Sequence, residues 1–76
     1  MEEKITAWIA RDGNMDLYIF FERPKKFKRF EYWDLENAEG MWGTNKELNK
    51  DLFPQVKWED GEPTKVKITI ELDLNE

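Results

Sequence analysis

The residues best suited to binding chemistry form one basic segment in an otherwise acidic chain. Residues 23–30 carry five basic and no acidic side chains, whereas the whole chain has a net charge of −5. Cations interleaved with aromatic rings can neutralise phosphates and stack bases, so the segment is a candidate patch for single-stranded nucleic acid. The patch consists of Arg23, Lys25, Lys26, Phe27, Lys28, Arg29 and Phe30. We favour the alternative of a solvated loop that protects a sheet edge, because the segment matches no named nucleic-acid module.

The carboxylates offer two weaker candidates. Residues 34–40 superficially follow a calcium loop, but Glu39 stands where that loop needs glycine, and Lys46 near its end has the wrong charge. A second acidic cluster lies within residues 59–62, where three carboxylates share one tight turn. Carboxylates on such turns are usually solvated, so we expect neither a metal site nor a paired-carboxylate catalyst.

The chain contains no cysteine, histidine or serine. The nucleophile–base pairs of serine and cysteine hydrolases cannot be assembled without these residues, and neither can zinc sites with His or Cys ligands. An enzyme that relies on Asp, Glu, Lys or Tyr alone is possible in principle. We expect a protein that is not an enzyme and has no catalytic residues, no metal ligands and no cofactor.

An N-terminal hairpin is the first element expected to position these groups. Two runs rich in β-branched and aromatic residues, within residues 5–21, flank the turn-forming residues 12–14. A three-residue loop would segregate the aliphatic side chains from Trp8, Tyr18 and Phe20, whereas a two-residue loop would mix them, so we favour three residues. The aliphatic face would then comprise Ile5, Ala7, Ile9, Met15, Leu17, Ile19 and Phe21.

Trp8, Tyr18 and Phe20 form the candidate interaction face, a platform for stacking or for docking a peptide. The alternative is a second small core, completed by rings from the middle of the chain. A domain of 76 residues buries only about 60% of its unfolded surface and needs most of its aromatic rings for folding, so we weight the second core more heavily. The rings expected to cover the face are Tyr32, Trp33 and Trp42.

The C-terminal half contains the most regular pattern. Between Val66 and Leu74, apolar and polar residues alternate strictly, which predicts a strand with one solvated face. Residues 55–58 alternate as well, and the turn chemistry that follows predicts a second, looser hairpin over 55–74. The middle of the chain is less regular. A strand is expected over 27–33, and the Thr-x-x-Glu capping box at 44–47 predicts a short helix near 45–52.

These elements predict one small globular domain over residues 1–76, mainly β with α+β as the alternative. We expect a small antiparallel sheet of three to five strands with an N-terminal hairpin, a C-terminal strand and one short helix. The longest apolar run, Leu17 to Phe21, is far too short to span a membrane, and the acidic start is unlike a signal peptide. A cytoplasmic location without membrane attachment is expected.

Two stretches support a resemblance. The string from Ala7 to Gly13 leads into Leu17-Tyr18-Ile19-Phe20, and a second string runs from Leu52 to Asp60, followed by Glu62-Pro63. Together they resemble a type of small hypothetical protein found in gut anaerobic bacteria and their phages or mobile elements. That type has no assigned activity, so the resemblance implies a bacterial, phage-linked, cytoplasmic protein and brings no site residues with it.

The sequence therefore favours a small interaction module that binds another macromolecule, most readily a protein, through a sheet edge or the aromatic face. Trp and Arg anchor many interfaces, and the chain has both while lacking cysteine, histidine and serine. The rival is single-stranded nucleic-acid binding through residues 23–30.

Overall fold

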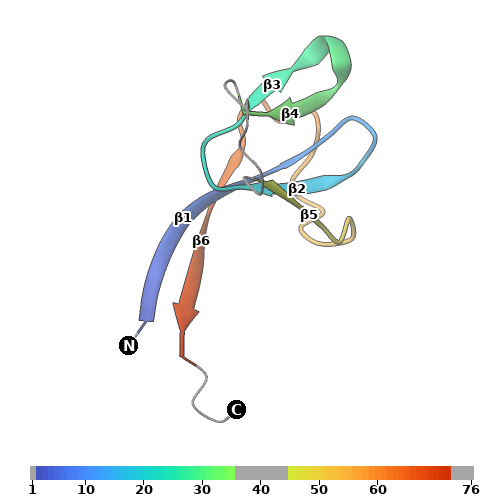
Figure 1. The fold of residues 1–76 in the computed structure, drawn as a ribbon. Helices are drawn as coiled ribbons and strands as arrows, with labels where there is room; N and C mark the ends of the chain where they lie inside the picture. Colours follow the sequence, from blue (N-terminus) through green and yellow to red (C-terminus); the bar gives the residue numbers. More distant parts are fainter. Residues whose placement is uncertain (1, 36–44, 73–76) are drawn as a thin grey trace.

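The computed structural model describes residues 2–35 and 45–72, which form two antiparallel sheets (Figure 1). The larger sheet has the strand order β5-β2-β1-β6, and the smaller one is the hairpin β3–β4. The mainly β fold and the antiparallel sheet are therefore confirmed. The strands are β1 (Glu2–Arg11), β2 (Leu17–Phe20), β3 (Lys25–Phe27), β4 (Tyr32–Asp34), β5 (Asn45–Leu48) and β6 (Thr64–Glu71), and one turn of 3-10 helix, η1 (Lys28–Phe30), follows β3.

The N-terminal hairpin is present, with a longer loop than predicted. Arg11 pairs with Leu17, so the loop spans residues 12–16 instead of 12–14. Inside it the Asp12 N–H donates to the Asp16 carbonyl at 2.8 Å, and Met15 takes a left-handed backbone with φ 81°. Ile5, Ala7, Ile9, Leu17 and Ile19 still share one face, because lengthening the loop by two residues preserves the two-residue period of a strand. Met15 and Phe21, also predicted on this face, lie in the loop and beyond β2, and both are exposed.

The larger sheet is covered on both faces by small hydrophobic cores. On one face Ile9, Leu17 and Val56 form a buried cluster. On the other face, the buried residues are Ala10, Phe20, Trp33 and Leu35. Trp33 and Leu35 come from the middle of the chain, so the prediction that this segment completes a second core is confirmed for Trp33, one of the three rings named for it.

The helix predicted near 45–52 is wrong, because residues 45–48 form the edge strand β5. β5 pairs with β2, and Leu48 lies opposite Leu17, against the first core. An isolated helix of eight residues is marginal in water, whereas the edge of β2 offers both backbone partners and an apolar contact. Thr44, the first residue of the predicted capping box, lies outside the described residues.

Two other predicted elements differ from the structure. Residues 55–58 lie in turns, and β6 pairs with β1 over eight residues, so the predicted hairpin 55–74 does not form. The strand predicted over 27–33 is instead divided between β3 and β4. The break falls at η1 and at Glu31, whose φ of 57° reverses the chain.

The turn of the β3–β4 hairpin packs closely against the β1–β2 loop. The Gly13 N–H donates to the Glu31 carbonyl at 2.8 Å. A Cβ on Gly13 would lie only 2.7 Å from the Cβ of Glu31, so this approach requires glycine. The contact fixes the hairpin relative to the larger sheet.

One part of the larger sheet extends away from the rest. β2 pairs only with residues 8–11 of β1, whereas β6 pairs with residues 2–9, so the outer ends of β1 and β6 form a two-stranded extension. We call residues 2–6 and 67–72 the ribbon; Figure 1 shows it leading to the two chain ends. The radius of gyration is 13.8 Å, against about 11 Å for a compact chain of this length. No helix in the described ranges is long and apolar enough to cross a membrane.

Candidate interaction surfaces

Arg11 is a buried cation that organises the loop before residue 57. It continues the apolar face of β1, and only 4% of its surface is exposed. Its Nε donates to the Val56 carbonyl at 2.7 Å. Its other bonds run from Nη1 to the carbonyls of Met15 and Lys50 at 2.8 and 2.9 Å, and from Nη2 to those of Leu52 and Phe53 at 2.9 and 3.2 Å. A guanidinium has five N–H donors in a rigid plane, which suits it to gather several carbonyls at once.

Sequence reasoning did not single out Arg11, although one signal was present. The residue follows Ile5, Ala7 and Ile9 at the same two-residue spacing, so its side chain falls on the buried face of β1. A charged residue in that position must find polar partners inside the protein. Except for that of Met15, the carbonyls that bind it come from about forty residues further along the chain, which no local pattern could indicate.

Lys26 belongs to the predicted nucleic-acid patch, but the structure directs its side chain inward. Its ammonium donates to the carbonyls of Trp58 and Asp60, the latter at 2.8 Å. It also lies 4.2 Å from the ring centroid of Trp58 and 5.4 Å from that of Trp33. Lys26 therefore connects β3 to the loop before β6, and its charge is directed away from solvent phosphates.

Asp12 lies buried at the end of β1, beside Trp33. Its Oδ1 accepts the backbone N–H of Trp33 at 2.9 Å, while the indole N–H of Trp33 donates to the Arg11 carbonyl at 3.1 Å. Burial raises the pKa of the Asp12 carboxyl above its usual 3.8. The hydrogen bond from Trp33 opposes this shift, and the nearby charges of Asp16 and Asp34 add to it.

The candidate interaction face of Trp8, Tyr18 and Phe20 is assembled as predicted but is largely occupied. Trp8 lies opposite Phe20 on the neighbouring strand, and the rings of Tyr18 and Phe20 are 6.4 Å apart. Phe20 is fully buried, beneath Trp33 and its neighbours in the second core, and the other two rings are half-buried. Burial raises the pKa of the Tyr18 hydroxyl, and the charge of Glu47 on β5 contributes next.

The two remaining rings expected to cover that face do not do so within the described residues. Tyr32 lies on the opposite face of the β3–β4 hairpin from Trp33, because side chains alternate along β4. Its ring stacks on Phe27, with centroids 5.3 Å apart and 17° between the planes. Trp42 lies outside the described residues.

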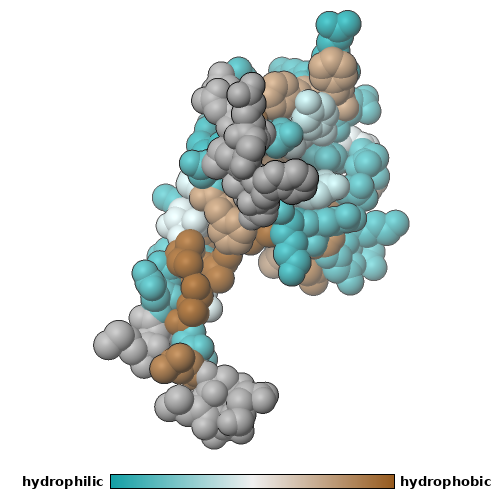
Figure 2. Space-filling view, in the orientation of Figure 1, coloured by the Kyte–Doolittle hydropathy of each residue, from teal (hydrophilic) through white to brown (hydrophobic). Residues whose placement is uncertain are grey.

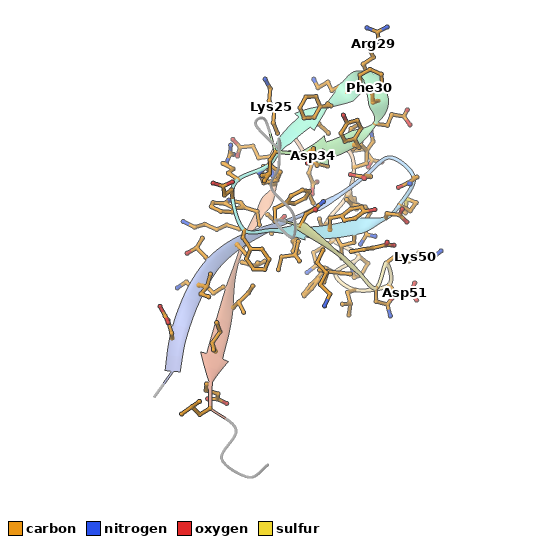
Figure 3. The ribbon with its side chains drawn as sticks, viewed as in Figure 1. Lys25, Arg29, Phe30, Asp34, Lys50 and Asp51 are labelled. Atoms are coloured by element: carbon orange, nitrogen blue, oxygen red, sulfur yellow. The ribbon has the colours of Figure 1, made fainter. Side chains whose placement is uncertain are left out.

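The tip of the β3–β4 hairpin gathers an aromatic array of three rings, of which Phe30 is exposed while Phe27 and Tyr32 are half-buried. Phe30 lies 6.1 Å from the ring of Tyr32 and is 63% exposed. The Arg29 guanidinium lies 5.5 Å from the Phe30 ring, and Figure 3 shows both side chains at the far end of the hairpin. Phe27 and Phe30 of this array belong to the predicted nucleic-acid patch. The third ring, Tyr32, was instead expected to cover the candidate interaction face.

The charges around this array are mixed. Arg23 lies 3.6 Å from Glu62 in an exposed ion pair, and Lys25 lies opposite Asp34 in the hairpin register. Lys28 and Arg29 are exposed at the tip, next to the aromatic array. Of the five cations predicted to form one patch, the structure therefore brings two to the rings and directs Lys26 into the protein.

The ribbon exposes apolar side chains on one face. Ile70 is 50% exposed and Leu72 is 73% exposed, while Ile5 and Ile68 lie opposite each other and are half-buried. Figure 2 shows apolar residues running along the ribbon. The opposite face carries the exposed polar residues that the alternation predicted. The apolar face is thus well covered only near the body of the domain.

The outer edge of β6 borders this face. β6 is the last strand of the larger sheet, so within the described residues no strand pairs with its outer N–H and C=O groups. Exposed edges of this kind are templates for pairing with another chain. Lys65, Lys67 and Glu71 supply the charges along this edge.

Two surface hollows lie within the described part of the chain. One, of about 430 Å³, is lined by Arg11 and residues of the loop that Arg11 holds. The other, of about 450 Å³, lies beside Lys26 and the Arg23–Glu62 pair. The buried carboxyl of Asp12 lines neither hollow, and the described residues contain no cluster of acidic side chains able to hold a metal ion.

Comparisons with known proteins found no match among protein-family models, curated proteins or solved structures. Within its described ranges, the chain is a small antiparallel β domain with a basic and aromatic hairpin tip and an uncovered apolar ribbon. A functional assignment has to rest on these two surfaces.

Proposed function

We propose that the chain is a non-enzymatic, cytoplasmic interaction module that binds another protein chain through the ribbon. The observation that carries the proposal is the coincidence of the open β6 edge with the exposed side chains of Ile70 and Leu72. A strand added to this edge gains main-chain hydrogen bonds, while its alternate side chains cover the apolar face.

The magnitudes favour this surface. Fully burying an Ile or Leu side chain contributes about 1.5–3 kcal/mol, so covering the exposed parts of Ile70 and Leu72 supplies a substantial part of a binding free energy. The candidate interaction face of Trp8, Tyr18 and Phe20 offers a partner less apolar surface to bury, because Phe20 is already at 0% exposure. Natural domains usually protect open sheet edges. The β6 edge carries charged side chains on one face of its strand and apolar side chains on the other, so the apolar face is the part that a partner would cover.

A matched pair of variants tests the proposal. The tagged full-length chain is used to capture proteins from an extract of its native host, in parallel with Ile70→Asn and the control Leu52→Asn. Leu52 is 45% exposed, close to the 50% of Ile70, but lies on the loop held by Arg11. We expect a protein that the wild type and Leu52→Asn retain and Ile70→Asn loses. Equal capture by all three chains contradicts the proposal.

A second candidate function is single-stranded nucleic-acid binding at the hairpin tip. The observation that favours it is the exposed Phe30 ring, which lies beside Arg29 and next to the stacked, half-buried pair of Phe27 and Tyr32. Stacking on an aromatic ring contributes about 1–3 kcal/mol per base, so Phe30→Ala should weaken oligonucleotide binding about tenfold. Phe21→Ala, which changes an exposed ring away from the tip, is the control. Fluorescence titration at low salt measures both, and an oligonucleotide that does not bind there excludes this function.

A further inference from the structure

We propose that the partner of the ribbon is a second copy of this chain, with β6 pairing antiparallel to its symmetry mate about a two-fold axis at Thr69. This inference rests on the proposed function, since it names the occupant of the same edge. It joins the two four-stranded sheets into one continuous sheet, and it covers the open edge of each copy with the edge of the other. Two-fold dimers use one self-complementary patch in both subunits, so β6 alone must supply both halves of the interface.

The charge order along β6 is self-complementary in this register. A two-fold axis at Thr69 places the residue that lies n positions before Thr69 opposite the residue n positions after Thr69 in the other copy. Lys67 therefore lies opposite Glu71 of the other copy. Symmetry creates this pair twice. Each opposite-charge pair across two strands contributes roughly 0.2–1 kcal/mol, and like charges there are unfavourable.

The apolar face is complementary in the same register. Ile68 of one copy lies opposite Ile70 of the other, and Val66 lies opposite Leu72. Directly opposite side chains share a face, so these residues extend the apolar surface of one ribbon into that of the other. The exposed side chains of Ile70 and Leu72 thereby gain apolar neighbours that their own chain does not provide.

Neighbouring registers satisfy fewer of these contacts. An axis at Lys67 would place the two Lys67 side chains opposite each other. An axis at Ile68 would place Leu72 opposite the polar residue Thr64. A shift by a single residue in the pairing would set charged side chains against apolar ones along the whole strand. The Ile68 axis also pairs opposite charges, Lys65 with Glu71, but it leaves Leu72 without an apolar partner. Of these three positions, Thr69 matches the most apolar residues while also pairing opposite charges.

Charge reversal tests the pairing directly. Sedimentation equilibrium of the full-length chain over about 1 μM to 1 mM covers the dissociation constants expected of a small interface. Wild type should show a monomer–dimer equilibrium. Lys67→Glu and Glu71→Lys should each weaken it by about tenfold, because each creates two like-charge pairs. The double variant Lys67→Glu/Glu71→Lys restores opposite charges and should return the dissociation constant to near the wild-type value.

Lys46→Glu is the matched control, since Lys46 is an exposed lysine on β5, the opposite edge of the sheet. It should leave the equilibrium unchanged. A wild type that stays monomeric throughout overturns the inference, as does a dimer that tolerates both single reversals or is not restored by the double variant. If the wild type is monomeric and still captures a protein that Ile70→Asn loses, the homodimer is excluded while the proposed function stands. A charge-dependent dimer that captures no other protein shows that the second copy is the whole partner.

Discussion

The body of the domain and its ribbon are stabilised in opposite ways. In the body, the irregular loop over residues 49–60 is held in place by Arg11 and Lys26, whose charged groups bond to its carbonyls. In the ribbon, β1 and β6 pair regularly as far as Glu2 and Glu71, yet apolar side chains remain exposed. Regular strand pairing alone therefore does not cover the apolar side chains of the ribbon.

The contrast shows how a short chain can order a long irregular segment without a disulfide. The guanidinium of Arg11 alone supplies several of the hydrogen bonds that strand pairing would supply in a sheet. The ammonium of Lys26 lies close to two tryptophan rings. Apart from the Met15 carbonyl bound by Arg11, the carbonyls that Arg11 and Lys26 bind lie more than thirty residues away in the sequence. The ribbon receives no such support from the described part of the chain, which is consistent with a role in binding a partner.

Removing the Arg11 guanidinium should produce the largest effect on the body. Arg11→Met leaves several buried carbonyls without their donor, and we expect a loss of about 3–5 kcal/mol in the free energy of unfolding. Arg29→Met removes an exposed guanidinium at the hairpin tip and should change stability by less than about 0.5 kcal/mol. Urea unfolding of both variants measures the difference. Equal stabilities would show that Arg11 does not support the loop.

Lys26 should have a smaller effect of the same kind. Lys26→Met keeps most of the apolar stem but removes the two hydrogen bonds and the charge above the Trp58 ring. We expect a loss of about 1–3 kcal/mol. The exposed Lys28 provides the control, with Lys28→Met expected to be nearly neutral. If both variants unfold at the same urea concentration, the proposed link between β3 and the loop is wrong.

The Asp12 carboxyl should make stability depend on pH. Its pKa is raised in the folded state, so the folded chain binds the proton more tightly than the unfolded chain. The contribution of Asp12 to stability must then fall as pH rises from about 3.8 through the raised pKa of the folded state. Asp12→Asn retains an acceptor for the Trp33 N–H but has no carboxyl to titrate. As pH rises through this range, the free energy of unfolding of Asp12→Asn should therefore increase relative to that of wild type.

Comparing Asp12→Ala with Asp12→Asn separates the effect of the Asp12 charge from that of the hydrogen bond it accepts from the Trp33 N–H. Asp12→Ala removes the acceptor of the buried Trp33 N–H and should be about 1–3 kcal/mol less stable than Asp12→Asn. Urea unfolding of the three chains at acidic and neutral pH provides the comparison. A wild type that gains stability over Asp12→Asn as pH rises would contradict the assigned burial.

The smallest effect is expected in the ribbon. Ile9 and Ile70 are the same residue type on the same face of neighbouring strands, but Ile9 is 2% exposed and Ile70 is 50% exposed. Ile9→Ala should cost about 2–5 kcal/mol. Ile70→Ala should cost less than about 1 kcal/mol when measured on dilute, monomeric protein. Similar losses for the two variants would remove the distinction between body and ribbon.

Local patterns in the sequence predicted the strands whose own residues alternate regularly, even though the partner of β6 is β1, more than fifty residues away. The alternation in β6 and the hairpin of β1 and β2 were both predicted, and the faces of the paired residues were correct although the loop is two residues longer. The capping box near residue 45 favoured a helix, but pairing with β2 outweighed that local signal. Trp33 was expected over Phe20 because the core needed rings, and that burial argument proved sufficient.

The candidate sites were predictable only in part. The sequence placed Phe27 and Phe30 among the basic residues, and the structure presents them at the hairpin tip. It could not show that Lys26 points inward, because the carbonyls that bind it lie more than thirty residues away. The exposure of Ile70 and Leu72 was equally hidden, since strict alternation indicates a buried face whether or not the chain contains anything to cover it.

Amide hydrogen exchange at increasing protein concentration tests the open β6 edge most directly. At low concentration, amides of residues 8–11 and 17–20 should be well protected, and those of β6 in the ribbon should exchange faster. Raising the concentration should slow exchange selectively along residues 66–72, as the outer N–H groups become paired with another copy. Ribbon amides that are as protected as the body in dilute solution, and that do not respond to concentration, would contradict this account.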